Sequence, residues 1–225
     1  MNKYEMLYDD KIEIGSHTLY RIRALKNFGT VKAGDIGGYI EKEENLSHEG
    51  TCWVYDNARV CDNARVCGDA RVCGDARVCD NAYVCDNACV YGNARVCGNA
   101  CVCGNARVYG NARVCDNAYV CDNACVYGNA RVCGDAKINK ISDVLCISPI
   151  GSRNDTTTFF KTKDGNICVK CGCFTDTIDK FLEAVSETHK DNKHAKAYKL
   201  ACELARVQIE LEDVRNGRIL FRVKR

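Results

Sequence analysis

Residues 54–78 read VYDNARVCDNARVCGDARVCGDARV, a run in which valine and alanine each return at every sixth position. Valine keeps this spacing from Val54 to Val132, and alanine keeps it from Ala58 to Ala136. A period of six fits neither an α-helix nor a simple alternating strand, but it is typical of stacked parallel strands. Alanine and valine lie two residues apart, so both point inward. The Gly or Asp and the Asn or Asp that follow form corners, because they tolerate left-handed turns.

A second period governs the slot after each inward valine, which holds either cysteine or tyrosine. Its tyrosines are Tyr55, Tyr91, Tyr109 and Tyr127, at intervals of eighteen or thirty-six residues. Eighteen residues are three hexads, so three strands complete one coil, and residues eighteen apart stack at about 4.8 Å. Residues 79–98 also recur unchanged as residues 115–134, a shift of two whole coils. The sequence therefore predicts a triangular solenoid of mainly β structure.

The hexad resembles that of the hexapeptide-repeat superfamily, with valine in the aliphatic slot and alanine in the small slot. The resemblance implies a left-handed parallel β-helix with three hexads, or eighteen residues, per coil. It covers residues 36–150, because Ile138, Val144 and Ile150 keep the aliphatic spacing while Ser142 and Ser148 occupy the small slot.

The whole chain also resembles uncharacterised hexapeptide-repeat proteins of bacteriophages, prophages and gut Firmicutes. The segments that carry this resemblance are LYRIRALKNFG, GDIGGYIEKEENLS, IGSRNDTTTFF and CGCF. It implies no established activity.

Residues 1–51 are predicted to form an N-terminal cap and a first irregular coil. Alternation in YEMLYDDKIEIGSHTLYRIRAL predicts a hairpin, and Ile36, Ile40 and Leu46 lead into the solenoid. A cap is needed because the first coil would otherwise expose its apolar core and unpaired backbone groups. We expect Trp53 to cover this boundary.

Residues 52–150 are assigned to the β-helix and residues 151–225 to a small C-terminal α+β domain. TTTFFKTK, DGN and ICVKCGCF predict a hairpin, followed by helices over about residues 176–189 and 192–212. Each helix has one apolar face. The first face carries Ile178, Phe181, Leu182 and Val185, and the second carries Tyr198, Ala201, Leu204, Ala205 and Ile209.

The composition excludes several classes of protein. A formal net charge of +2 argues against a polyelectrolyte partner such as nucleic acid. No apolar stretch approaches the length of a membrane span, and the start MNKYEMLYDDK lacks the layout of a signal peptide. We therefore expect a cytoplasmic protein, of a bacterial host if it is phage-encoded. Its nineteen cysteines are an odd number and follow the repeat, which favours reduced thiols over a disulfide scaffold.

An arginine ladder is the first candidate binding surface. One outward column of the predicted solenoid holds Arg59, Arg77, Arg95, Arg113 and Arg131. Like charges about 5 Å apart repel, so this ladder needs solvent, counter-charges or an anionic partner. Asp62, Asp80 and Asp116 at the next corner supply partial neutralisation. The ladder is either a solvated face or a surface that binds a partner.

A polar turn at the start of the C-terminal domain is the second candidate. Ser152, Arg153, Asn154 and Thr156 supply hydroxyl and amide groups with one fixed cation, and Cys173 precedes a predicted helix start. Arginine and helical N–H groups bind phosphate or carboxylate, although Asp155 and Asp176 oppose a negative ligand. An ordinary loop is the alternative. His189 is a further candidate residue of this site. As an alternative, its position at a helix C-terminus allows a favourable interaction with the helix dipole.

Two groups of cysteines are possible metal ligands. Cys168, Cys171 and Cys173 form a C-x-x-C-x-C run, with Cys171 and Cys173 expected on one strand face, but no second Cys/His pair at zinc-site spacing accompanies it. The cysteine columns of the solenoid permit vertical disulfides or metal binding by their Cα spacing, but tolerated outward positions explain them as well. No metal and no cofactor are predicted.

The family resemblance suggests one possible catalytic activity. Many relatives are acyltransferases that use a histidine near the coils and bind acyl-coenzyme A between subunits of a trimer. Here all histidines lie in the end pieces, and no insertion interrupts the hexads between Val54 and Ile138. These histidines are His17, His48, His189 and His194. The sequence leans against an enzyme, with an acyltransferase and an oligomeric scaffold as alternatives.

The sequence therefore predicts a non-enzymatic protein that binds a protein partner or a small anionic ligand such as a nucleotide. Flat solenoid faces predict self-association as a trimer or dimer. The resemblance to phage proteins suggests interference with a host immune or regulatory factor or with its nucleotide signal.

Overall fold

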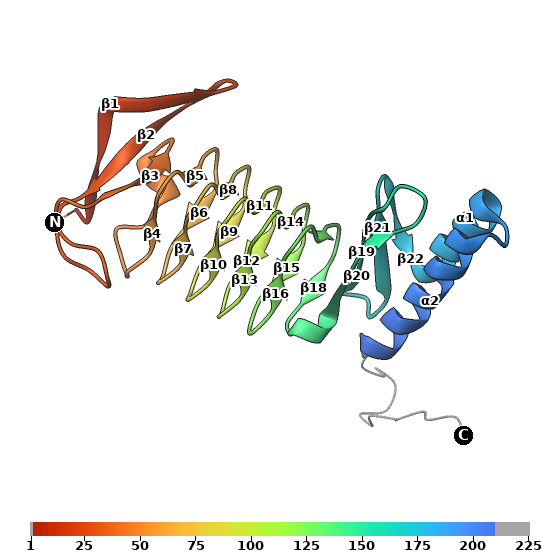
Figure 1. Cartoon of the computed structure of the whole chain (residues 1–225). Helices are drawn as coiled ribbons and strands as arrows, with labels where there is room; N and C mark the ends of the chain where they lie inside the picture. Colours follow the sequence, from red (N-terminus) through yellow and green to blue (C-terminus); the bar gives the residue numbers. More distant parts are fainter. Residues whose placement is uncertain (1, 210–225) are drawn as a thin grey trace. The chain divides into compact units, whose positions relative to one another are not determined.

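The computed structural model describes residues 2–209 and divides the chain into two compact units, Met1–Ile141 and Ser142–Arg225. The first unit is a stack of triangular coils with a β-hairpin at its start (Figure 1). The second unit is an antiparallel sheet with two helices.

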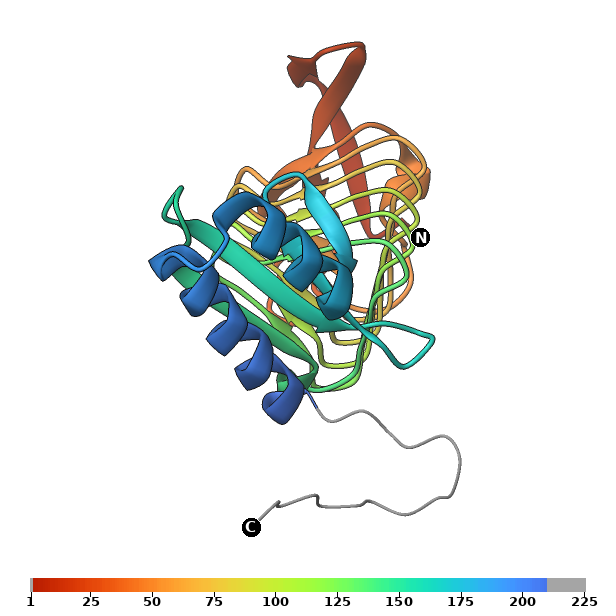
Figure 2. The same cartoon turned by 90° about the vertical axis from the view of Figure 1, so that its right-hand side faces the viewer.

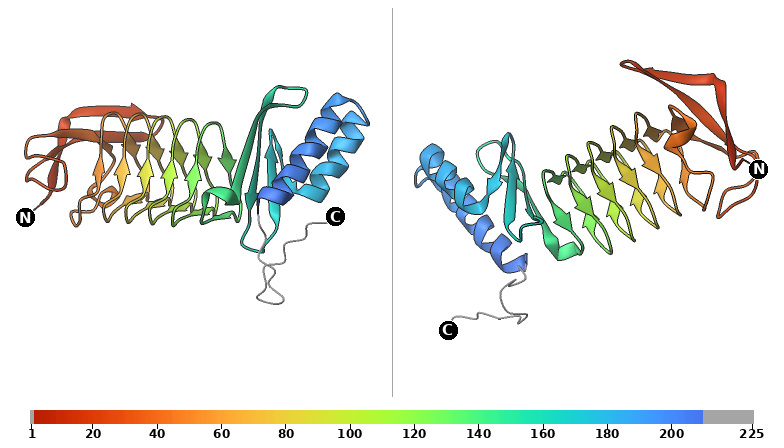
Figure 3. Two further views of the ribbon diagram at one scale, coloured as in Figure 1. Left: turned by 60° about the horizontal axis from the view of Figure 1, so that its bottom comes forward. Right: turned by 180° about the vertical axis from the view of Figure 1, so that it is seen from behind.

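Three parallel sheets make the faces of the left-handed β-helix (Figure 3). Strand partners are eighteen residues apart, as in the pairing of Arg59 with Arg77, which confirms the predicted coil length. Each sheet stacks five two-residue strands of the repeat. One contains β5 (Arg59–Val60), β8 (Arg77–Val78), β11 (Arg95–Val96), β14 (Arg113–Val114) and β17 (Arg131–Val132). The second contains β4 (Trp53–Val54), β7 (Arg71–Val72), β10 (Cys89–Val90), β13 (Arg107–Val108) and β16 (Cys125–Val126). The third contains β6 (Arg65–Val66), β9 (Tyr83–Val84), β12 (Cys101–Val102), β15 (Tyr119–Val120) and β18 (Lys137–Ile138).

The interior of the coils consists of the repeated valines and alanines, which are almost completely buried. The corners turn through left-handed residues, such as Asp62 with φ of 59° and Gly98 with φ of 68°. Corner carboxylates also join successive coils, because the backbone N–H of Gly98 donates to Asp80 Oδ2 over 2.8 Å. The sequence pattern therefore determines the core and the corners together.

The N-terminal hairpin is confirmed as β1 (Tyr4–Ile14) and β2 (His17–Ala24). It continues through β3 (Ile36–Ile40), which pairs in parallel with β5, and a 3₁₀ turn η1 (Glu43–Asn45). Ile40 and Leu46 are buried, but Ile36 is 53% exposed. This segment leads into the solenoid as predicted, because β3 pairs in parallel with β5 through Tyr39 and Ile40, although Ile36 at the start of β3 is not part of the core.

Trp53 seals the first coil as expected. Its side chain is only 1% exposed, and its indole lies 6.1 Å from the ring of Tyr4 and 5.4 Å from that of Phe28. The buried ammonium group of Lys3 donates to the carbonyl of Cys52 over 2.8 Å. Burial lowers the pKa of Lys3, but these contacts satisfy its polar head.

His17 ties the hairpin to the coils and makes this contact sensitive to pH. Its Nδ1 lies 2.9 Å from Glu41 Oε1, and its Nε2 lies 3.4 Å from Asp62 Oδ1. The hydrogen bond with Glu41 and the charge of Asp62 raise the pKa of His17 above its ordinary value. The stabilisation is therefore complete below a pH of about 6.5 and is lost as the pH rises through the raised pKa.

We predict that the melting temperature of the wild type, relative to a His17→Gln variant, falls as the pH increases from about 5 to 9. Glutamine keeps a polar side chain but does not titrate, so the difference isolates the imidazole. A difference that stays constant over this range would contradict the prediction.

The C-terminal unit contains four antiparallel strands and two helices (Figure 2). The strands are β19 (Val144–Ile150), β20 (Asp155–Lys161), β21 (Ile167–Cys171) and β22 (Phe174–Thr177). A 3₁₀ turn η2 (Ile141–Asp143) precedes them. The predicted hairpin is β20 and β21, whereas β22 is an additional strand. The helices are α1 (Ile178–His189) and α2 (Lys193–Gln208), and the predicted helix end at Glu212 lies outside the described residues.

The coil repeat ends at β18, so its predicted continuation through Val144 and Ile150 is wrong. These residues lie in β19, where Val144 pairs with Phe160 in antiparallel register. Residues six apart share a face in any strand of period two, so this spacing alone does not identify a coil. The division between the two units falls after Ile141, earlier than the predicted boundary at residue 150.

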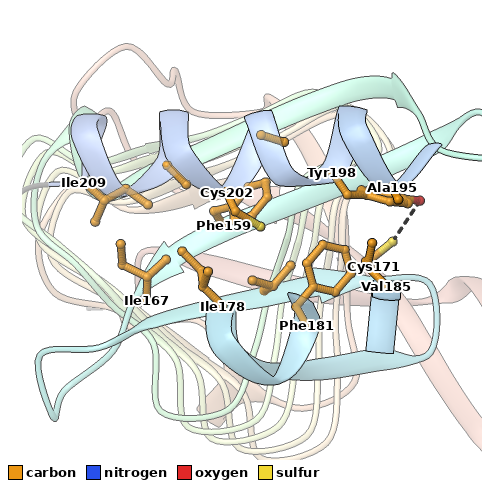
Figure 4. Packing of buried hydrophobic residues seen from close by; sticks show 13 residues of the cluster. Phe159, Ile167, Cys171, Ile178, Phe181, Val185, Ala195, Tyr198, Cys202 and Ile209 are labelled. Carbon is orange, nitrogen blue, oxygen red and sulfur yellow. Dashed lines mark hydrogen bonds between the residues drawn. The ribbon is translucent and has the colours of Figure 1, made fainter. Parts of the chain in front are cut away.

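The helices pack on one face of this sheet through a common apolar cluster that includes Phe159, Phe181 and Cys202 (Figure 4). The predicted faces hold for Ile178, Phe181 and Val185, with Leu182 partly buried. Leu204 is 48% exposed, so its predicted place in the core is wrong. Cys202 takes that place, because it lies one turn from both Tyr198 and Ala205 on α2.

Candidate functional site

The arginine ladder forms as predicted on one face of the β-helix. Strand pairing places Arg77, Arg95 and Arg113 directly above one another, and all three are exposed. Arg59 and Arg131 continue the ladder at its two ends, with Arg59 half-buried. The ladder is therefore a continuous column of positive charge.

The corner aspartates beside the ladder have structural partners of their own. Asp62 Oδ2 accepts the backbone N–H of Asp80 over 3.2 Å, and Asp116 Oδ2 accepts that of Gly134 over 3.0 Å. Their carboxylates thus link coils while they contribute negative charge near the ladder.

A cavity of about 270 Å³ lies within the C-terminal unit. Its lining combines an apolar aromatic wall with polar groups. The lining residues are Ser152, Arg153, Cys171, Cys173, Phe174, Phe181, Ala184, Val185, Thr188, His189 and Tyr198.

The aromatic wall comes from β22, α1 and α2. The ring centroids of Phe174 and Phe181 are 5.2 Å apart, and Phe181 lies 5.2 Å from Tyr198 in an edge-on arrangement. The Tyr198 hydroxyl and the Cys171 thiol interact over 3.6 Å (Figure 4). Burial raises the pKa of Tyr198 to about 12, with a further contribution from Cys171, so the phenol stays protonated at neutral pH.

Two glycines make room for the polar groups of the cavity. A Cβ atom at Gly151 would collide with the Tyr198 hydroxyl, and one at Gly172 would collide with the Arg153 guanidinium. Both glycines have positive φ, 75° and 59°, which other residues rarely adopt. The turns at these glycines therefore position Tyr198 and Arg153 closely against the backbone.

Four of the predicted turn and helix residues meet at this cavity, namely Ser152, Arg153, Cys173 and His189. Asn154 and Thr156 are not part of its lining. Thr156 is buried and its hydroxyl donates to Ser148 Oγ over 2.9 Å, whereas Asn154 adopts a left-handed turn with φ of 49°. Both residues therefore shape the connection between β19 and β20.

The cavity follows the second half of α1, from Phe181 to His189, rather than its N-terminus. Free helical N–H groups are thus not part of its lining, contrary to the expectation for the region near Asp176. Phe181 and Tyr198 were predicted only as packing residues, and Thr188 was not predicted as part of a site. For Phe174 the sequence does carry a signal, because it follows Gly172 and Cys173 directly ahead of the predicted helix start.

The cysteine run at the end of β21 divides between two environments. Cys171 is buried and Cys173 is exposed beyond the strand end, yet both line the cavity. Cys168 does not line it. The expectation that Cys171 and Cys173 share a strand face is wrong, because β21 ends at Cys171.

The histidines have distinct surroundings. The His48 ring stacks on Tyr4 at 4.4 Å, and its Nδ1 accepts the backbone N–H of Lys3. His189 lies 5.8 Å from the ring of His194 and 5.9 Å from that of Tyr198. His48 and His17 thus serve the N-terminal cap, while His189 belongs to the cavity.

Within residues 2–209, the helices are too short or too polar to span a bilayer.

Two comparisons with known proteins find similarities, and one of them falls on the coils. A family model described as the YdcK β-solenoid repeat matches residues 54–74, 64–80, 100–116 and 106–122. Among curated proteins, the chain is similar to a protein named uncharacterized acetyltransferase YdcK from Escherichia coli K12, with 47% identity over 38 residues. This match covers 17% of the present chain and only 12% of the E. coli protein. The repeat, its stacked coils and both similarities fit a β-helix of hexapeptide-type repeats.

Proposed function

We propose that the protein is a binding protein that holds a small anion with a flat apolar group in the cavity of its C-terminal unit. The observation that carries this proposal is the combination of Arg153 with the aromatic wall of Phe174 and Phe181. The β-helix supplies a rigid body with further surfaces for a partner.

The chemistry of the lining suits a nucleoside monophosphate. The guanidinium of Arg153 offers a planar fork for a phosphate, and the protonated Tyr198 hydroxyl supplies a further donor. A base packs favourably against aromatic rings. Ligand sites usually measure roughly 300–1,000 Å³, so a cavity of about 270 Å³ favours a mononucleotide over a larger cofactor.

Calorimetry with AMP, adenosine and inorganic phosphate tests this proposal. We predict that AMP binds more tightly than either fragment, and that Arg153→Ala weakens AMP binding by about tenfold or more, since a hydrogen bond to a charged group contributes about 1.5–3 kcal/mol. The affinity of the wild type is also expected to fall with added salt.

The control is the triple variant Arg77→Glu, Arg95→Glu and Arg113→Glu, which reverses the centre of the ladder without touching the cavity. It should retain full affinity for AMP. Loss of binding in this variant but not in Arg153→Ala would move the site to the ladder. Full affinity in both variants would refute both locations.

An acyltransferase is the second candidate function, favoured by the name of the similar E. coli protein. It predicts turnover of acetyl-coenzyme A that is lost on replacement of one histidine. His189 is the relevant candidate, because it lines the cavity whereas His17 is engaged by two carboxylates. Turnover that survives His189→Ala and His194→Ala would exclude this mechanism.

A partner protein remains part of the proposal. The resemblance to phage proteins supports interference with a host immune or regulatory factor or with its nucleotide signal, and the flat coil faces support a dimer or trimer. Binding of a nucleotide in the cavity would support interference with a nucleotide signal of the host.

A further inference from the structure

The β-helix carries a column of five stacked thiols beside the arginine ladder. These are Cys61, Cys79, Cys97, Cys115 and Cys133, each one coil from the next. The thiol of Cys79 interacts with those of Cys61 and Cys97, and the thiol of Cys115 interacts with those of Cys97 and Cys133. The five sulfurs therefore form one continuous row, which we call the thiol column.

We propose that the thiol column binds a row of Cu(I) ions, each held linearly between the sulfurs of two successive coils. Soft thiolates select Cu(I). The ligand atoms of Cys115, Asp116 and Cys133 lie within 4.8 Å of one another. An ion midway between the two sulfurs would thus lie at most about 2.4 Å from each, close to the ~2.3 Å of a metal–thiolate bond.

The spacing of the coils favours two-coordinate binding over a zinc site. Zinc takes four ligands in structural sites, and the only other ligand atom in this group is a carboxylate oxygen of Asp116. That carboxylate already accepts the backbone N–H of Gly134 and lies 3.7 Å from the Cys115 thiol. Two sulfurs per gap are therefore the available donors, as linear Cu(I) requires.

Positive charge lies beside the column. Arg113 and Arg95 are neighbours of the Cys97 thiol and attract a thiolate there. On binding, each S–H bond breaks, its proton passes to solvent and an S–Cu bond forms, with no change in oxidation state. The arginine ladder compensates the negative charge of the thiolates.

The stoichiometry follows from the geometry. Five thiols enclose four gaps, so the column holds up to about four ions, with each internal sulfur bridging two of them. Cys97 is the middle thiol and borders two gaps. A Cys97→Ser variant should therefore lose about two Cu(I) ions from the column.

Cys89→Ser provides a matched control on another face of the same coils. Cys89 is also outward and half-buried, but its neighbours above and below in the sheet are Arg71 and Arg107. Its own column therefore has an arginine on both sides of it, so no row of stacked sulfurs passes through Cys89. Both replacements are isosteric and outward, and thermal melting verifies that each variant is folded.

The experiment is an anaerobic titration of the reduced, full-length protein with Cu(I) in the presence of a chromogenic Cu(I) chelator, followed by measurement of the copper retained after desalting. We expect the wild type to retain several ions, Cys97→Ser to retain about two fewer, and Cys89→Ser to match the wild type. Equal retention by wild type and Cys97→Ser, equal loss in both variants, or no retention by the wild type would overturn the proposal. A parallel titration with Zn(II) should show no dependence on Cys97, and a Cys97-dependent zinc site would refute linear coordination.

Discussion

Replacing Ala94 with phenylalanine is expected to destabilise the β-helix by about 3 kcal/mol or more, at the severe end of overpacking. Ala94 is completely buried, and the coils fill their interior with only alanine and valine in this region. A phenyl ring in this slot has no space unless the adjacent coils separate, which would break the hydrogen bonds between them. Urea denaturation followed by circular dichroism measures the change in the free energy of unfolding.

The matched control for this variant is Arg95→Phe. Arg95 is the next residue, begins β11 and is exposed on the outside of the coil. The same aromatic side chain should therefore change stability there by only about 0.5 kcal/mol. An unshifted unfolding curve for Ala94→Phe would contradict the inward assignment of the alanine column.

Replacing Trp53 with alanine is expected to cost about 3–5 kcal/mol, the range for removal of a large buried aromatic side chain. Trp53 fills the space between Tyr4, Phe28 and the first coil, so its loss leaves a cavity under the cap. The cap also covers a sheet edge that otherwise pairs with other chains. The variant should therefore unfold at lower urea concentration and scatter more light at partial denaturation.

Arg71→Ala is the control for the cap variant, because Arg71 is the strand neighbour of Trp53 one coil further along. Arg71 is exposed and lies beyond the cap, so its truncation should leave stability nearly unchanged. Equal destabilisation by both replacements would assign the effect to the sheet face rather than to the cap.

The repeat is the part of this molecule that sequence predicts best. Within six neighbouring residues each hexad contains its own strand, its core residues and its corner. Val60 and Ala94 are buried where the period places them, and Asp62 turns the chain with positive φ. The six-residue spacing wrongly predicted further coils at Val144 and Ile150, because an antiparallel strand satisfies this spacing equally well. Local spacing does not specify which strand is the partner.

The cavity was only partly predictable for a related reason. Arg153 and His189 are 36 positions apart, and they line one cavity only because the sheet and α1 bring them together. Polar composition drew attention to Ser152 and Arg153, whereas the contributions of Phe174 and Thr188 depend on the packing of β22 and α1. Tyr198 was predicted as a packing residue because helical periodicity does not reveal what its hydroxyl contacts.

The identical segments 79–98 and 115–134 have a consequence for how such a protein changes over generations. Recombination between two identical tracts removes or adds thirty-six residues, and thirty-six residues are two complete coils. Such an event leaves every remaining residue in its inward, corner or outward slot and lengthens or shortens the stack by about 9.6 Å, twice the strand spacing. The length of the β-helix is therefore a heritable variable that can change in a single step while each corner, core slot and outward column stays in register.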